Sequence, residues 1–175
     1  VGPNGWISHF AEEELGVDLT VLSDATVEFA GHINADGKGY GPTEGPGVGS
    51  ASQSYAGGGG FGGYGGRDSA GRAGGTPYGS IVSPARLGSG GGKSDSGAGG
   101  GYIYLVVGGE LTVDGQISSR GVGGNGAGSG GGVLIEAGSL SGSGVISVNG
   151  GDTTRSDSGG GGGGRLAVYT DEDSF

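Results

Sequence analysis

His32, Asn34, Asp36 and Gly37 are spaced like the start of a calcium-binding loop. In that loop, side-chain oxygens at alternate positions coordinate the ion, and a glycine allows the sharp turn that follows. Here a histidine occupies the first position and no glutamate follows at the end of the loop. We therefore predict no metal site and no cofactor, with Asn34 and Asp36 as the residues that would bind calcium if one were present. The alternative is that both are turn formers at the end of a strand.

Asp114, Arg120 and Glu136 are the side chains that could form a hydrolase or lyase site. Enzymes of these classes built on stacked β-strands use acidic and basic residues on one exposed strand face. The simpler interpretation is a solvated face whose residues alternate with those of the core. His9 and His32 lie in unrelated contexts, so they do not complete a serine–histidine–acid arrangement. The sequence predicts no catalytic residue, and we expect a protein that is not an enzyme.

Five aromatic residues in one glycine-rich stretch form the candidate ligand-binding set. Exposed aromatic rings on a rigid loop suit stacking on sugars or on protein surfaces. The alternative is that these rings pack the glycine-rich backbone together. The set comprises Tyr40, Tyr55, Phe61, Tyr64 and Tyr78.

Short β-strands separated by glycine runs are the elements that must position these side chains. In the stretch 99–121, apolar residues recur with a period of two, which is the pattern of strands with one buried face. The stretch 18–37 aligns with 102–121 without a gap, and 140–150 repeats the second half of both. The sequence therefore contains a repeated two-strand unit.

The alignment places Ile33, Ile117 and Ile146 at equivalent positions. Two short strands cannot bury an apolar face alone, so we expect the units to stack and these isoleucines to form an interior ladder. Strand hydrogen bonds would then join successive units as parallel pairs. Other equivalences in the ungapped alignment are Leu19 with Ile103, Val27 with Leu111 and Phe29 with Val113.

Three glycine runs end at Gly101, Gly132 and Gly164, each directly before a strand pattern. A repeat of roughly 30 residues predicts a stacked solenoid. We predict an all-β fold in which 18–175 forms a parallel β-helix of about four coils, right-handed by the general preference of parallel crossovers.

Glycine accounts for 52 of the 175 residues, about four times its ordinary usage. A long insertion at 38–100 interrupts the first coil, and within it 59–67 has a Gly-Gly-X period of three. That period matches an extended three-fold helix of the polyproline II type. We predict glycine-rich loops of this polyglycine II kind, packed on one side of the β-helix. The alternative is a flexible loop, which the entropic cost of ordering glycine favours.

The segment 1–17 differs from the rest and is predicted to be an N-terminal cap. Ser8 could begin a short helix through Leu15, with Gly16 ending it. One interpretation is a docking helix, and the other is a lid over the open end of the strand stack. The apolar residues available for such a lid are Trp6, Ile7, Phe10 and Leu15.

The formal net charge is −10, from 18 acidic and 8 basic residues. An acidic chain repels phosphate backbones, so nucleic acid is not an expected partner. No apolar run approaches the ~20 residues of a membrane span, and none is predicted. Cysteine is absent, which excludes disulfides and thiolate metal sites. Because methionine is also absent, even at position 1, we expect a mature product or a segment of a larger protein.

The repeats GGELTVDGQISSRG, GSLSGSGVISVNGG and GGGGGGRLAVYT resemble the glycine-rich β-helical repeats of large microbial surface and secreted proteins. The resemblance covers roughly residues 18–170. It implies an extracellular or cell-surface location, a structural or adhesive role, and neighbouring copies or adjacent repeats of the same protein as partners. The Gly-Gly-X stretches also resemble the polyglycine-helix layers of phage tail-tip adhesins and of some receptor ectodomains.

We therefore expect a non-enzymatic structural or adhesive module. It would be a repeat of a surface protein or a filament subunit that stacks through its β-helix ends, because such ends expose strand edges. The alternative is a carbohydrate-binding or carbohydrate-active β-helix protein, whose partners would be surface glycans.

Overall fold

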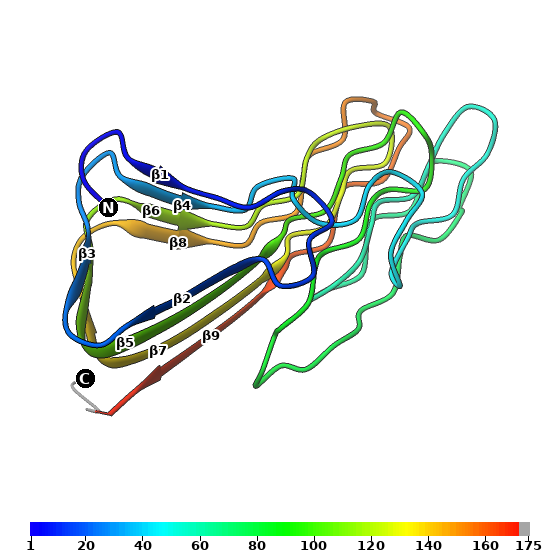
Figure 1. Ribbon diagram of the computed structural model, residues 1–175. Coiled ribbons are helices and arrows are strands. Elements are labelled where there is room, and N and C mark those ends of the chain that lie inside the picture. Colours follow the sequence, from blue (N-terminus) through cyan, green and yellow to red (C-terminus); the bar gives the residue numbers. More distant parts are fainter. Residues whose placement is uncertain (172–175) are drawn as a thin grey trace.

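A computed structural model describes residues 1–171, which form an all-β structure, as predicted, and contain no helix (Figure 1). The predicted domain 18–175 extends beyond these described residues. The described strands form two parallel sheets. In spatial order, the first sheet comprises β1 (Trp6–Ile7), β4 (His32–Asn34), β6 (Gln116–Ser118) and β8 (Val145–Ser147). The second comprises β2 (Val17–Val21), β5 (Tyr102–Val113), β7 (Gly132–Ser141) and β9 (Arg165–Thr170), with β3 (Ala25–Val27) also paired to β5.

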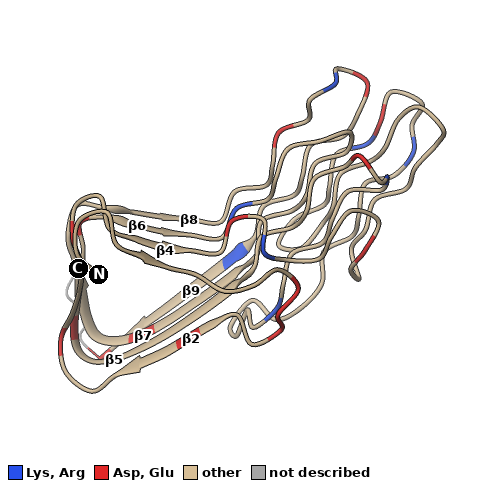
Figure 2. Cartoon of the chain, turned by 45° about the horizontal axis from the view of Figure 1, so that its top comes forward, with Lys and Arg blue, Asp and Glu red and all other residues tan. Residues whose placement is uncertain are grey.

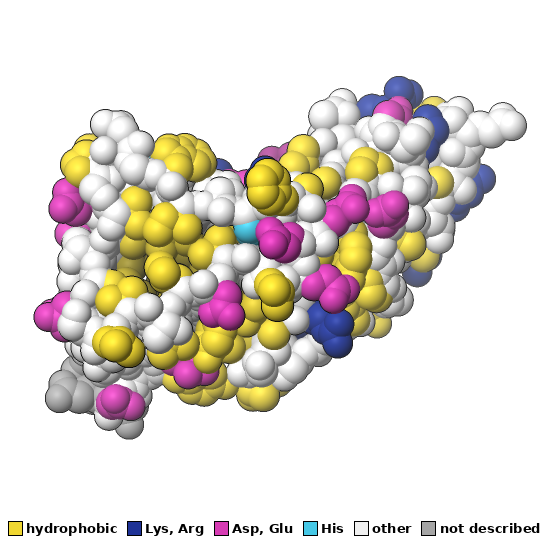
Figure 3. All heavy atoms as spheres, in the orientation of Figure 1, with side chains coloured by type: hydrophobic (Ala, Val, Ile, Leu, Met, Phe, Trp, Pro, Cys, Tyr) yellow, Lys and Arg dark blue, Asp and Glu magenta, His cyan; other side chains and the backbone are white. Residues whose placement is uncertain are grey.

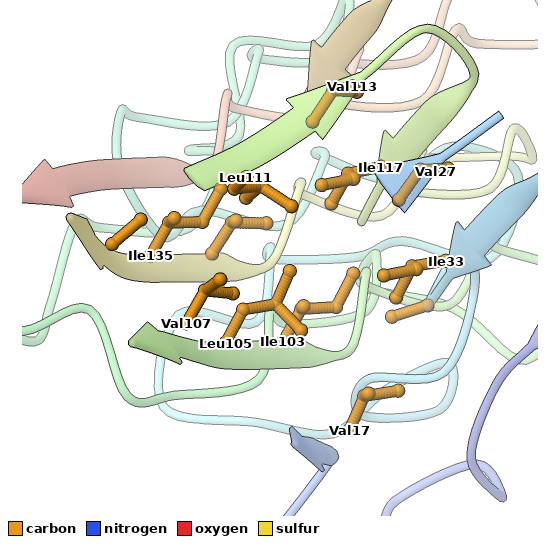
Figure 4. Close-up of a cluster of buried hydrophobic side chains, with 13 residues drawn as sticks. Val17, Val27, Ile33, Ile103, Leu105, Val107, Leu111, Val113, Ile117 and Ile135 are labelled. Atoms are coloured by element: carbon orange, nitrogen blue, oxygen red, sulfur yellow. The ribbon is translucent and has the colours of Figure 1, made fainter. Parts of the chain in front are cut away.

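The predicted isoleucine ladder is confirmed in the first sheet. Ile33 pairs in register with Ile117, and Ile117 pairs with Ile146, through parallel strands. Ile7 of β1 extends the ladder by one further strand. Ile33 and Ile117 are 2% and 0% exposed, so the inner face of this sheet forms one wall of the core (Figure 4).

The second sheet forms the opposite wall of that core. Along β5, Ile103, Leu105 and Val107 alternate with residues of the outer face, as the period of two predicts. Each is paired in register with an apolar residue of β7. Figure 4 shows these side chains on the inner side of their strand, among side chains of the facing sheet. The core is therefore a stack of matching apolar columns.

The ungapped alignment is wrong by two residues before Gly31. In the structure Leu19 pairs with Leu105, and Val27 pairs with Val113. The reason is the corner between the sheets: β3 and β4 are separated by residues 28–31, whereas β5 and β6 are separated only by 114–115. The extra residues include Phe29, which the alignment placed in the core and which is 81% exposed.

The predicted N-terminal helix over Ser8–Leu15 is also wrong. The chain instead forms β1, then a turn, and then β2. Phe10 and Leu15 are 84% and 74% exposed, so a helix here would have no apolar face to bury, and packing of such a face supplies most helical stability in proteins. Gly16 has a φ of 62°, and a Cβ on it would lie 2.2 Å from the Tyr102 carbonyl oxygen. This glycine is therefore needed for a tight turn.

The glycine-rich segments extend beyond the strands and lie side by side (Figure 1). Backbone hydrogen bonds join them across large sequence separations. Gly162 donates to Gly59, Gly130 donates to Gly162, and Gly66 donates to Gly160. The insertion 38–100 is thus bonded to the shorter runs before β7 and β9. The contacts are so close that an added Cβ at most of these glycines would overlap a neighbouring backbone.

Leu87 attaches the insertion to the outer face of the second sheet. It is 2% exposed and packs with Tyr102, Leu134 and Ala167. Ile81 and Val82, which lie in the same part of the insertion, do not pack against the sheet and are 72% and 62% exposed. Those two residues lie in a bend around Ser80–Ser83, so their side chains face outward.

Two glycines of one run provide a matched test of this packing. A Cβ at Gly161 would lie 1.9 Å from the Gly128 carbonyl oxygen, whereas a Cβ at Gly163 has nothing within 4 Å. We predict that Gly161→Ala lowers the free energy of unfolding by about 1–3 kcal/mol, as overpacking does. Gly163→Ala should be neutral or slightly stabilising. Chemical denaturation of both variants provides the measurement, and equal stabilities would contradict close packing of the run.

Candidate functional site

Phe61 and Tyr78 of the insertion pack against each other beside β9, with Phe61 buried and Tyr78 half-buried. Phe61 is 0% exposed, and its ring centroid lies 4.9 Å from that of Tyr78. The Tyr78 hydroxyl donates to the Leu87 carbonyl at 2.5 Å, and burial raises the pKa of Tyr78 to about 12. Arg165 of β9 donates its Nε–H to the Tyr78 carbonyl and lies 5.8 Å from the Phe61 ring. Both rings therefore pack the structure together, and Phe61 has no surface to offer a ligand.

Tyr40, Tyr55 and Tyr64 occupy three different environments. Tyr40 packs partly buried against the cluster around Leu87. The Tyr55 ring lies 5.6 Å from the guanidinium carbon of Arg155. Tyr64 is 73% exposed. The five predicted aromatic residues therefore do not form one surface.

Tyr64 lines a surface hollow of about 440 Å³ in the glycine-rich region. Arg67 and Thr76 also line it, together with small residues. A ring exposed beside a guanidinium and a hydroxyl can stack on a sugar while neighbouring donors bind its hydroxyls. Tyr64 is thus the predicted aromatic residue best placed for ligand contact.

Asn34 and Asp36 use their polar atoms within the chain. Asn34 donates its Nδ2–H to the Ser118 hydroxyl at 3.1 Å and accepts the Asp36 N–H on Oδ1 at 3.1 Å. Asp36 accepts the Arg120 backbone N–H at 2.7 Å, and its other oxygen lies 3.6 Å from Arg120 Nε. These bonds fit the turn-forming alternative, because they fix the strand exits of β4 and β6 side by side.

A second, polar hollow of about 550 Å³ lies beside these strand exits. The side chains of Asp36, Arg120, Asn149 and Asp152 line it, together with glycines and threonines. In the described part of the chain, no group of three or more histidine, cysteine, aspartate or glutamate side chains is arranged to bind a metal ion. The hollow's chemistry is hydrogen bonding around one ion pair.

The three residues considered for catalysis lie apart. Asp114 precedes β6 and accepts the N–H and hydroxyl of Ser143 at 3.0 and 3.2 Å. Arg120 follows β6 and pairs with Asp36. Glu136 lies on the outer face of β7, next to Tyr104 of β5. Desolvation raises the pKa of Tyr104, and the negative charge of Glu136 raises it further. Charged residues are likewise spread over strands, turns and loops of the described chain (Figure 2).

An apolar hollow of about 250 Å³ opens between the two sheets at the end that carries β1 and β2 (Figure 3). Its lining includes Ile7 from one sheet and Leu19 and Val21 from the other. Sequence periodicity placed such residues in the core, and it carries no signal that the core is open here. Trp6, beside the hollow, is 62% exposed and stacks on His32 with ring centroids 4.4 Å apart.

The described residues contain no helix long and apolar enough to cross a membrane.

His9 is the titratable group whose ionisation should affect stability. Its ring nitrogens are buried without hydrogen-bond partners, and its Nε2 packs close to the Gly101 backbone. Burial lowers the pKa of His9 below 6.5, while the Phe10 backbone and the Glu13 charge oppose the shift in part. The folded state therefore favours neutral His9, and the unfolded chain binds a proton first as the pH falls.

We predict that the stability supplied by neutral His9 is complete above pH 6.5 and is lost as the pH falls below 6.5 toward its folded-state pKa. Denaturant unfolding should be measured at about pH 7.5 and pH 5.5 for the chain and for His9→Gln, since carboxylates contribute equally to both. The unmodified chain should lose more stability than the variant over this interval. An identical loss in both proteins would refute the assignment.

Comparison of the chain with protein-family models, with curated proteins and with solved structures gave no match. The function proposed below therefore rests on the chain's own residues and geometry.

Proposed function

We propose that this chain is a non-enzymatic structural or adhesive module of the cell surface or extracellular space, which joins neighbouring copies or adjacent repeats of the same protein through its ends. The strand pairs form successive coils of a right-handed parallel β-helix, and the glycine-rich segments form a polyglycine II layer beside it. Two features support these assignments: the alternation of the chain between two parallel sheets, and the directions of the glycine hydrogen bonds.

The alternation supports the β-helix. From β4 to β9, successive strands along the chain belong to the two sheets in turn: β4, β6 and β8 to the first, and β5, β7 and β9 to the second. Each return to a sheet adds a strand beside the previous one, always parallel to it. A chain that advances by one strand spacing at every return is the connectivity of a coil.

The hydrogen-bond directions support polyglycine II. Successive N–H groups of the run before β7 donate to three segments of the chain, and Gly128 and Gly131, which are three residues apart, donate to the same one. Gly128 donates to Val122, Ser129 to Ser89, Gly130 to Gly162 and Gly131 to Ser119. A β-strand presents its backbone groups to two sides only, whereas a helix with three residues per turn presents them all around its axis. Glycine allows the neighbouring backbones to approach within hydrogen-bond distance.

The main support for the stacking role is that the apolar core is open to solvent at the end of the molecule formed by β1 and β2. The hollow between Ile7 and Leu19 is apolar and accessible, and the outer edges of β1 and β2 have no strand partner among the described residues. Exposed apolar surface combined with free strand edges is the usual mark of an association surface. At the opposite end, the outer edges of β8 and of residues 165–169 of β9 have no strand partner in residues 1–171.

Sedimentation velocity over a wide range of protein concentrations tests this role. We predict that the weight-average sedimentation coefficient rises with concentration, because association buries both apolar ends. Val168→Lys places a charge at a 38% exposed position of β9 and should keep the protein monomeric with an unchanged circular dichroism spectrum. A single monomeric species of the unmodified chain at every concentration would overturn the stacking role.

A carbohydrate-binding function is the second candidate, and the exposure of Tyr64 favours it. We predict that glycan-array binding, where present, is lost in Tyr64→Ala, because the ring supplies the stacking platform. Tyr55→Phe keeps a ring in a different environment and should retain binding. Unchanged glycan binding by Tyr64→Ala would exclude the hollow that Tyr64 lines as the sugar site.

A further inference from the structure

The apolar columns of the core end at β9 in side chains that no further strand of the described chain covers. One column runs through Leu19, Leu105, Ile135 and Val168, which are paired in register. Leu105 and Ile135 are 2% and 0% exposed, whereas Val168 is 38% exposed. A neighbouring column ends similarly at Leu166, which is 43% exposed. The terminal members lack only the next strand.

A column on the outer face of the first sheet ends in the same way. It consists of Trp6, His32, Gln116 and Val145. Trp6 covers His32 from one side, while Val145 at the other end is 55% exposed. Each end of the molecule therefore carries a large apolar side chain at the same position across the strands.

We infer that the two ends bind each other, so that copies of this chain associate head to tail. In this arrangement β9 of one copy pairs with β2 of the next, and β8 pairs with β1, both parallel. The inference rests on the proposed stacking role and adds its direction and register. The apolar contacts would be Val168 with Leu19, Ile146 with Ile7, and Val145 with Trp6. Leu166 would lie opposite Val17, which is already only 6% exposed, so this pair would cover mainly Leu166.

Continuity with the strand pairing inside the molecule identifies a second copy as the occupant. Every strand pair within the two sheets is parallel, and only a head-to-tail arrangement continues that direction. Two identical ends meeting around a two-fold axis would pair their strands antiparallel. The head-to-tail register also places apolar residues opposite apolar residues in both core columns. A heterologous contact of this kind leaves a free end on each copy, so it propagates into a filament.

Net charge predicts how salt affects the contact. Each copy carries −10, and Glu12, Glu13 and Glu14 are exposed near the β1 and β2 end. Copies therefore repel one another at low ionic strength, and screening weakens that repulsion. Association should strengthen as sodium chloride is raised, as expected for an apolar contact between like-charged molecules.

Engineered cysteines test the register, because the chain has no cysteine of its own. Extending the register of β1 by one residue places Ser8 opposite Ser147 of the neighbouring copy. Paired Cα atoms of parallel strands lie about 4.8 Å apart, within the range that a disulfide bridges. Asn34 and Ser118 occupy the equivalent positions on β4 and β6 within one molecule, and there Asn34 Nδ2 lies 3.1 Å from the Ser118 hydroxyl. Asn34→Cys with Ser118→Cys is therefore an intramolecular positive control.

The experiment mixes the Ser8→Cys protein with the Ser147→Cys protein under mild oxidation. A disulfide-linked dimer is expected, and one chain carrying both substitutions should give a ladder of covalent oligomers. A mixture of Ser8→Cys and Val145→Cys is the matched control. In the proposed register the Cα atoms of residues 8 and 145 would lie about 8 Å apart, so this control mixture should give roughly tenfold less dimer than the Ser8→Cys and Ser147→Cys mixture.

The outcomes separate the inference from the proposed stacking role. Concentration-dependent association without the Ser8–Ser147 cross-link would overturn the register while leaving stacking intact. A dimer of Ser8→Cys alone, at a yield equal to the mixture, would overturn the head-to-tail direction. Absence of both cross-linking and sedimentation change would overturn the stacking role itself.

Discussion

Hydrogen bonding between backbone segments that are distant in sequence is the interaction on which this structure depends. In the sheets it takes the form of parallel strand pairs, and in the glycine-rich region it joins neighbouring runs in several directions. The glycine runs have almost no side chains to bury, so their order requires satisfied backbone groups and close backbone contact. That requirement excludes a Cβ at positions such as Gly75, where it would lie 1.6 Å from the Gly47 carbonyl oxygen. The glycine content is thus a packing requirement of the fold.

The two regions stabilise each other because the chain passes through the glycine-rich region between β4 and β5, between β6 and β7, and between β8 and β9. The strands fix both ends of the shorter glycine runs, which lowers the entropy lost when those runs order. The glycine region in turn reaches the outer face of the second sheet through Leu87, and its Phe61–Tyr78 pair contacts Arg165 of β9. Aromatic residues that could have served binding therefore serve this junction, while Tyr64 alone among them is largely exposed.

Periodicity predicted the strands and the isoleucine ladder because alternation along a strand directly encodes which face is buried. It could not predict the length of a corner, so the register before Gly31 was wrong by two residues. The predicted helix at Ser8–Leu15 failed because local capping signals do not report whether an apolar face has anything to pack against. The candidate site was less predictable still. Whether Phe61 is buried or Tyr64 exposed depends on contacts between glycine runs, and these leave no pattern in the sequence beyond the glycines themselves.

Amide hydrogen exchange across the glycine runs shows whether their backbone groups are held in stable hydrogen bonds. If the runs form an ordered hydrogen-bonded layer, the amides of residues 128–131 should exchange as slowly as those of β5 and β7. Gly163 is an internal reference for rapid exchange, since it is exposed and its N–H has no acceptor within residues 1–171. Exchange of residues 128–131 at the rate of an unstructured chain, with β5 and β7 still protected, would show that the glycine runs are not an ordered layer.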